Sequence, residues 1–190
     1  MKTSRLEAFS DGVIAIIITI MVLELRPPHE VTLESLRPLI PVLIGYVLSF
    51  LYIGIYWVNH HHLIHASQHV NGRVLWANLH LLFWLSLIPF ATAWMGETRF
   101  AMWPVVLYGV LLLLAAIAYT VLVRALLTLH GPDSFLADAL GADFKGKISI
   151  VIYLASLGLA FLNPWLGFTG YAIVAIIWLI PDRRIERKMH

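Results

Sequence analysis

Residues 5–23 read RLEAFSDGVIAIIITIMVL, and this stretch decides the fold. Its last twelve residues hold one glycine and one threonine, and the others are aliphatic or methionine. The hydrocarbon core of a bilayer, about 30 Å thick, requires roughly 20 apolar residues in a helix. We therefore expect a first membrane-spanning helix over residues 8–26, with the acid Asp11 near one membrane surface.

The composition of the whole chain indicates a membrane protein. Of its 190 residues, 60% are hydrophobic and 13% are charged, and a soluble domain of this length could not bury so much apolar surface. The first apolar run ends in LELRPP rather than in a small-residue cleavage site, so we expect it to be retained. The absence of cysteine excludes disulfides and thiolate metal sites, and a net charge of +2 without a basic stripe argues against a nucleic-acid partner.

Six apolar runs are long enough to cross a bilayer as helices. They cover residues 8–26, 39–60, 75–96, 101–127, 146–163 and 165–181. Lys and Arg divide ten to three between the two sets of flanking segments, which places both termini of a multi-pass plasma-membrane protein in the cytoplasm. The ten are Lys2, Arg5, Arg73, Arg124, Lys145, Lys147, Arg183, Arg184, Arg187 and Lys188, and the three are Arg26, Arg37 and Arg99. The sequence thus predicts an all-α integral membrane protein with one six-helix domain over residues 1–190.

Two further segments carry structural signals. Pro89 lies inside the third run and is expected to kink that helix. Residues 132–147, PDSFLADALGADFKGK, mix apolar and charged side chains and precede the fifth run. We expect them to form a short amphipathic stretch at the membrane interface.

One stripe of the first helix repeats in steps of four and three, the spacing of a heptad seam. The seam consists of Arg5, Phe9, Gly12, Ile16, Thr19, Leu23 and Arg26. Gly12 and Thr19 could simply allow close packing against another helix. Alternatively, copies of the helix surround an axis, so that Ile16 and Leu23 form hydrophobic rings on either side of a ring of Thr19 hydroxyls. Asp11 points away from the seam in both interpretations, and an intramembrane carboxylate requires a partner.

The start of this helix resembles that of a known family. Arg5, three further residues and then Phe9, Ser10 and Asp11 form the RxxxFSD motif of the transmembrane protein 175 family, the endolysosomal potassium channels and their prokaryotic relatives. The chain has one motif and one set of six spans, and so is similar to the prokaryotic single-repeat branch, which forms homotetramers. The resemblance implies a fold unlike that of the usual tetrameric potassium channels, and no TVGYG-like filter sequence occurs here.

The resemblance also implies roles for particular residues. In the family the first helix lines the pore and bulky aliphatic side chains constrict it, which by spacing from the motif implies Ile16 and Leu23, with Thr19 between them and Ile20 contributing. The motif residues would join helices through hydrogen bonds near the cytoplasmic end. We expect the partner of Asp11 to be Arg5 or a polar or aromatic side chain of the second and third spans. The candidates are Trp57, His62, Asn78 and His80.

Histidines cluster around the end of the second span. They are His60, His61, His62, His65 and His69. The spacing of His61, His65 and His69 puts them on one helical face and is compatible with a metal site. The alternatives are a polar helix end that faces the cytoplasm and histidines that bond the RxxxFSD network. A di-iron oxygenase would need several separated histidine clusters, and beyond this one only His80 lies in a plausible second position, which argues against an enzyme.

The expected function is therefore passive potassium conduction through a homotetrameric pore in the lipid bilayer, with modest selectivity and no cofactor. A secondary transporter of a cation or small solute is the main alternative, although such proteins often show internal repeats and broken helices. A membrane scaffold without transport is a third hypothesis. Flux down a gradient without a coupled ion distinguishes the channel from both.

Overall fold

The computed structural model describes residues 3–140 and 144–179, and this part of the chain contains helices and no strands. The all-α class predicted from the sequence is confirmed. In chain order the elements are α1 Ser4–Leu23, the 3₁₀ helix η1 Glu34–Leu39, α2 Ile40–His65, α3 Gly72–Ser86, α4 Ile88–Glu97, α5 Met102–His130, α6 Phe135–Leu140, α7 Phe144–Leu162 and α8 Pro164–Leu179.

Each of the six predicted spans overlaps one helical rod, because η1 runs into α2 and only Leu87 separates α3 from α4. Five rods are long and apolar enough to cross a membrane, and the sixth, α8, is an apolar helix of 16 residues. The first two rods have other bounds than predicted: α1 begins at Ser4 rather than at residue 8 and ends at Leu23, so that Arg26 of the predicted seam lies beyond it, and α2 continues past residue 60 to His65. Hydropathy marks only the apolar part of a helix, whereas the backbone hydrogen bonds continue into the polar ends.

The third rod is broken at Leu87. Pro89 lies in the first turn of α4, where its missing N–H removes no helical hydrogen bond. The Leu87 N–H donates to the Trp84 carbonyl at 3.3 Å, and Ser86 Oγ donates to the Phe83 carbonyl at 2.7 Å. The kink expected at Pro89 is therefore a full break, at which one helix ends and another begins.

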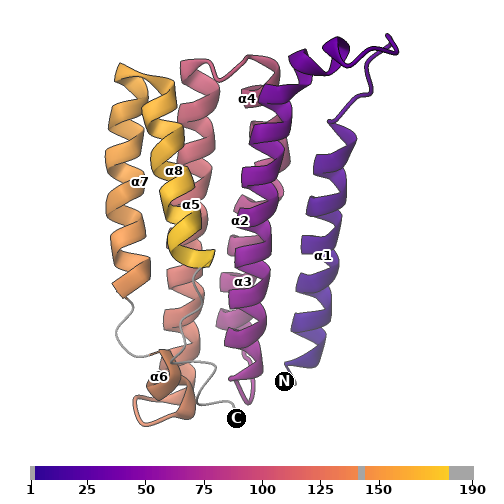
Figure 1. Ribbon diagram of the computed structural model, residues 1–190. Coiled ribbons are helices and arrows are strands. Elements are labelled where there is room, and N and C mark those ends of the chain that lie inside the picture. The colour runs from indigo at the N-terminus through magenta and orange to yellow at the C-terminus, as the bar shows by residue number, and fades with distance from the viewer. Residues whose placement is uncertain (1–2, 141–143, 180–190) are drawn as a thin grey trace.

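The rods stand side by side, with α1 and α7 at opposite edges (Figure 1). α1 packs against α2, α3 and α4, whereas α5 packs against α3, α4, α7 and α8 in the middle of the molecule. We call the end that holds the start of α1 the motif end, and the end that holds residues 24–39 the linker end. The short helix α6 lies at the motif end beside α5, within the stretch expected at the membrane interface (Figure 1). Residues 141–143 of that stretch, Lys2 and the basic tail Arg183, Arg184, Arg187 and Lys188 lie outside the described residues.

Buried hydroxyl groups join α2 to its neighbours. Ser49 Oγ lies 2.7 Å from Thr92 Oγ1 and 2.9 Å from the Tyr108 hydroxyl, and the Tyr52 hydroxyl donates to the Tyr171 carbonyl at 2.6 Å. A hydroxyl in a membrane interior has little water to bond, so it needs a protein partner. These bonds connect α2 with α4, α5 and α8 and form the body against which α1 is placed.

Candidate ion pathway and motif network

α1 buries one face and exposes the opposite one. Its buried face contacts the body of the chain through Leu6, Ser10, Ile14, Ile17 and Met21. All seven residues of the predicted seam, from Arg5 to Arg26, are exposed in the single chain. Ile16 is 58% exposed and Leu23 is 74% exposed, although both are large aliphatic residues. The single chain therefore leaves the seam uncovered, open to lipid or to another chain.

The Thr19 side chain lies on the exposed seam between these two aliphatic residues. Its hydroxyl donates a hydrogen bond of 2.9 Å to the carbonyl of Ile16, one turn earlier in the helix. Because the hydrogen is used in this bond, the lone pairs of Oγ1 remain available to an external donor or a cation. The seam thus presents one polar acceptor between two apolar side chains.

Asp11 and Trp57 form the first contact of the motif network. The Trp57 indole Nε1 donates a hydrogen bond of 3.0 Å to Asp11 Oδ1, linking α2 to α1. Asp11 is partly buried and lies on the side of α1 that faces α2. The predicted pairing of Asp11 with a side chain from the second span is therefore present in the structure.

A second, fully buried part of the network joins α1, α2 and α3. Asn78 Nδ2 donates to Ser10 Oγ at 2.9 Å, and Ser10 Oγ donates to the Leu6 carbonyl at 2.8 Å. Asn78 Oδ1 lies 2.7 Å from His60 Nε2. Since an amide oxygen can only accept, the imidazole carries its hydrogen on Nε2. Three helices are thus joined through Ser10, Asn78 and His60, each with no solvent exposure.

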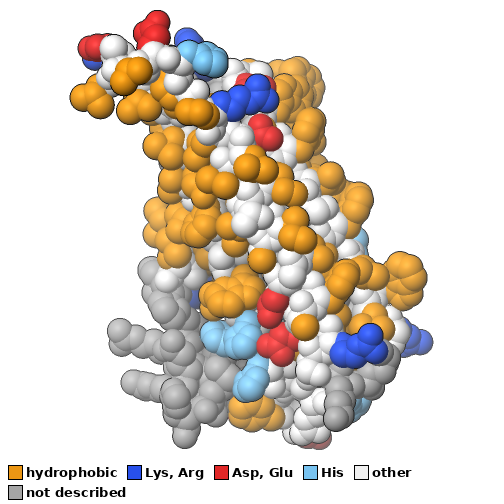
Figure 2. All heavy atoms as spheres, turned by 90° about the vertical axis from the view of Figure 1, so that its right-hand side faces the viewer, with side chains coloured by type: hydrophobic (Ala, Val, Ile, Leu, Met, Phe, Trp, Pro, Cys, Tyr) orange, Lys and Arg blue, Asp and Glu red, His pale blue; other side chains and the backbone are white. Residues whose placement is uncertain are grey.

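A third contact lies closer to the motif end. Glu7 Oε1 lies 2.9 Å from His61 Nδ1, and both side chains are partly exposed. Glu7 and Asp11 are one turn apart on α1, and Trp57 and His61 are one turn apart on α2. Because the two helices are antiparallel, Asp11 lies opposite Trp57 and Glu7 lies opposite His61. Figure 2, which looks at the α1 side, shows acidic and histidine side chains gathered at this end below a broad hydrophobic region.

The remaining predicted motif residues lie away from this network. Arg5 and Phe9 are exposed on the seam side of α1. The His62 ring lies 5.8 Å from that of His61, and the His80 ring contacts Trp84 edge to face at 6.1 Å. Among the described residues, neither His62 nor His80 forms a hydrogen bond with the motif.

The sequence left open that histidines of the cluster bond the motif network, but it did not single out His60 or pair Glu7 with His61. A signal was present, because positions 60 and 61 follow Trp57 by three and four residues and so share its helical face. The rings of His61 and His65 stack at 5.9 Å. Within the described part of the chain, however, no group of three or more His, Asp or Glu side chains is placed to hold a metal ion.

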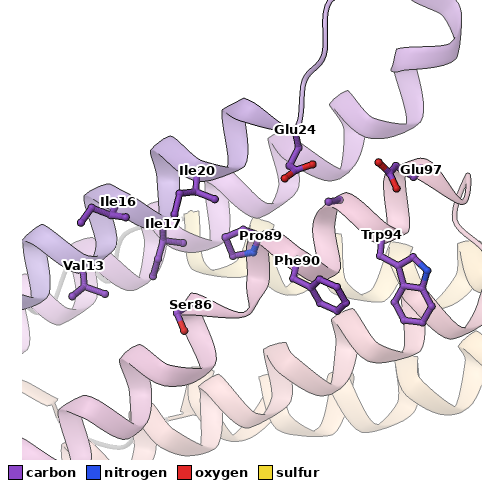
Figure 3. Close-up of a pocket in the computed structure, with 11 residues that line it drawn as sticks. Val13, Ile16, Ile17, Ile20, Glu24, Ser86, Pro89, Phe90, Trp94 and Glu97 are labelled. Carbon is purple, nitrogen blue, oxygen red and sulfur yellow. The ribbon is translucent and has the colours of Figure 1, made fainter.

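A groove of about 840 Å³ lies between α1 and the α3–α4 rod (Figure 3). Glu24 and Glu97 lie at its linker end, and the rest of its lining is almost entirely apolar. Those other lining residues are Val13, Ile16, Ile17, Ile20, Ser86, Pro89, Phe90, Ala93 and Trp94. The break at Leu87 helps to form the groove, because Ser86 and Pro89 on either side of it both contribute to the wall.

Known proteins share both the sequence and the fold of this chain. Residues 5–89 match the family model described as endosomal/lysosomal potassium channel TMEM175. A protein named potassium channel, from Chryseobacterium sp. (strain P1-3), is 51% identical over 189 residues, which cover 100% of this chain and 98% of that protein. The chain belongs to the TMEM175 family. The family resemblance carried by the RxxxFSD motif is thereby confirmed.

Members of the TMEM175 family differ in length and in the permeant ion that their names give. The crystal structure of a lysosomal potassium-selective channel TMEM175 homolog from Chamaesiphon minutus superimposes with a TM-score of 0.81 at 29% identity, covering 96% of this chain and 97% of that one. A protein from Danio rerio named endosomal/lysosomal proton channel TMEM175 is 27% identical over 135 residues, which are 68% of this chain and 25% of that protein. The chain therefore shares nearly its whole length with the bacterial homologue and one part of the longer animal protein.

Proposed function

We propose that this chain is a potassium channel of the cell membrane, in which four copies surround a pore lined by α1. The observation that carries the proposal is the exposure of the entire seam, with Ile16 58% and Leu23 74% exposed in the single chain. The names of the Chryseobacterium relative and of the Chamaesiphon homologue support potassium as the permeant ion.

The seam suits the wall of a narrow pore. Ile16 and Leu23 are seven residues apart, which is about 10 Å along a helix axis. Around an axis they would form two hydrophobic constrictions, which can close a pore by excluding water. The Thr19 hydroxyls would lie between them with their lone pairs toward the axis, where they could replace part of an ion's hydration shell. Selectivity over sodium would be modest, because a single ring of hydroxyls replaces few water molecules.

The motif network has a supporting role in this proposal. Asp11, Ser10 and Glu7 bond to Trp57, Asn78 and His61, and so fix the rotation of α1 relative to α2 and α3. A rotation of one residue, about 100°, would replace Ile16 on the seam by a neighbour. The acid near the membrane surface would then orient the pore helix rather than bind the permeant ion.

The orientation proposed in the membrane follows from charge. Arg5, Arg73, Arg124, Lys145 and Lys147 lie at the motif end or in the helical turns next to it, whereas the linker end carries Arg26, Arg37 and Arg99. The positive-inside rule then places the motif end, and with it both termini, in the cytoplasm. Conduction of this kind requires neither a cofactor nor enzymatic chemistry.

A secondary transporter is the second candidate, because the break between α3 and α4 is a feature of such proteins. Potassium efflux from proteoliposomes distinguishes the two when no exchangeable ion or solute is present outside. A channel releases potassium only when a protonophore compensates the charge, whereas an electroneutral potassium–proton exchanger releases it without a protonophore and an exchanger for another solute releases none. Flux that requires an external substrate would contradict the channel.

The pore assignment is tested in the same liposomes with Ile16→Ser and Leu23→Ser. A smaller, polar side chain at a hydrophobic constriction should raise potassium flux severalfold. It should also reduce the difference between potassium flux and sodium flux. Ile176→Ser is the matched control, since Ile176 on α8 is also 58% exposed. If Ile16→Ser and Leu23→Ser behave like Ile176→Ser, α1 does not line the pore.

A further inference from the structure

The groove between α1 and the α3–α4 rod has the size and lining of a ligand site. Its volume of about 840 Å³ lies within the range of pockets that hold drug-sized molecules, roughly 300 to 1,000 Å³. Aliphatic side chains of α1 form one wall, and Phe90 and Trp94 of α4 contribute aromatic rings to the other (Figure 3). Such walls favour an elongated apolar group.

The linker end of the groove carries negative charge. Glu24 follows the last residue of α1 and is partly buried, whereas Glu97, the last residue of α4, is exposed. Neither carboxylate forms an ion pair among the residues the structure describes, and no Lys or Arg lines the groove. The nearest cations along the chain, Arg26 and Arg99, are both exposed and lie outside the lining. The apolar walls therefore lead to a mouth with two carboxylates that lack a counter-charge.

We propose that this groove binds an amphipathic amine, a molecule with one permanently or readily protonated ammonium group and an apolar tail. The ammonium would lie between Glu24 and Glu97, and the tail would extend along α1 past Phe90 and Ala93. The Trp94 ring lines the groove near the charged mouth, where its face could also stabilise the cation (Figure 3). The bound molecule would contact Ile16 and Ile20 from the side of α1 and would restrain the helix.

Charge distinguishes this occupant from two others. The fatty chain of an anionic phospholipid would fit the apolar walls, but its phosphate would be repelled by the two carboxylates. A neighbouring copy of the chain could fill the same space in the assembled protein. The three occupants give different results in one binding experiment, and that experiment does not depend on ion flux.

The experiment uses the full-length protein in nanodiscs of phosphatidylglycerol, a lipid without an ammonium group, with a bromine atom on the part of the probe tail nearest the head group, where it would lie beside Trp94 and quench its fluorescence. The probes are 6-bromododecyl trimethylammonium, 6-bromododecanol and 6-bromododecanoate. We expect saturable quenching by the ammonium probe, most of it lost in Trp94→Phe and retained in the matched control Trp76→Phe. Trp76 is 75% exposed on α3 and does not line the groove.

The carboxylates are tested with the double variant Glu24→Gln and Glu97→Gln, which keeps both side-chain shapes. Removal of two partly solvated charges should weaken binding of the ammonium probe about tenfold and leave the alcohol probe unchanged. Ala93→Trp, which fills the groove, should abolish quenching through Trp94. The double variant keeps the test valid if Ala93→Trp does not fold.

Two results would overturn the proposal. Equal quenching by all three probes would identify a groove for fatty chains without a charge requirement. Absence of quenching through Trp94 by any probe would indicate that the neighbouring subunit covers the groove. Both results would leave the channel proposal standing, because potassium flux is measured separately.

Discussion

Trp57 Nε1 lies 3.0 Å from Asp11 Oδ1, so an indole of α2 holds the acid of the motif on the side of α1 away from the seam. The same helix presents Ile16 and Leu23 to the outside of the subunit. One helix thus has a polar face for its own chain and an apolar face for the proposed pore. The two faces predict separate effects of substitution.

Loss of the Asp11 carboxylate should affect assembly rather than selectivity. Asp11→Ala leaves the Trp57 N–H without its acceptor and should cost about 1 kcal/mol of stability. Asp11→Asn keeps Oδ1 as an acceptor and should retain most of the stability. Thermal unfolding and the oligomer fraction in size-exclusion chromatography measure the effect, with the exposed Glu30→Ala as control. A stable oligomer of Asp11→Ala with altered ion preference would place the carboxylate in the pathway instead.

Asn78 should be the most sensitive position of the network. It donates to Ser10 and accepts from His60 in a fully buried site. Asn78→Ala leaves the buried His60 Nε2–H without an acceptor and removes one of the two hydrogen bonds of Ser10 Oγ, which keeps its bond to the Leu6 carbonyl. We expect a loss of about 2 to 3 kcal/mol of stability, mostly from this one unpaired buried group. Asn71→Ala, which removes the cap of α3, should cost about 1 kcal/mol. Equal melting temperatures for Asn78→Ala and Asn71→Ala would contradict the prediction that the Asn78 hydrogen bonds contribute more to stability than the helix cap.

The pair formed by Glu7 and His61 should contribute little to stability. Its atoms are 2.9 Å apart, but the His61 side chain is 44% exposed, and exposed pairs contribute about 0 to 1 kcal/mol. A double-mutant cycle with Glu7→Gln and His61→Gln should give a coupling within that range that decreases with added salt. A coupling above about 2 kcal/mol would mean that the pair is shielded from solvent in the assembled protein.

The Thr19 hydroxyl should matter for flux and not for folding. Thr19→Val keeps the shape of the side chain but removes the oxygen that faces outward, and we expect a decrease of about tenfold in potassium flux, equivalent to about 1.4 kcal/mol. Thr19→Ser keeps the oxygen and should conduct normally. Thr169→Val on α8, where the hydroxyl bonds to the Trp165 carbonyl at 2.8 Å, is the matched control. Normal potassium flux through Thr19→Val would show that the Thr19 hydroxyls have no role in conduction.

The first helix could be predicted in detail because three signals coincide on it. Its length, the motif and the steps of four and three all concern one continuous segment, and the structure exposes every residue of the predicted seam. Of the four candidate partners for the motif, Trp57 and Asn78 form hydrogen bonds with Asp11 and Ser10.

The histidine that joins the network could not be chosen from the sequence. Adjacent residues on a helix point about 100° apart, so the rotation of α2 decides which of His60, His61 and His62 faces α1 and α3. Hydropathy leaves that rotation open, because α2 is apolar on nearly every face. The contact of Trp57 with Asp11 sets it, and this directs His60 to Asn78 and His61 to Glu7.

The groove was also beyond prediction from the sequence. Pro89 indicates that the third rod is interrupted, but it does not give the direction in which α4 continues. That direction depends on the packing of α4 against α2 and α5, which includes the bond between Ser49 and Thr92. The space left beside α1 follows from this long-range contact.

The most direct test of the central claim is a single cysteine at the seam. The chain contains no cysteine, so Leu23→Cys provides one thiol on α1, and Leu162→Cys provides a control at the end of α7, where Leu162 is 81% exposed. A positively charged methanethiosulfonate reagent is added to proteoliposomes during potassium efflux. The account predicts that the reagent stops flux through Leu23→Cys and not through Leu162→Cys. Undiminished flux through fully modified Leu23→Cys would contradict a pore lined by α1.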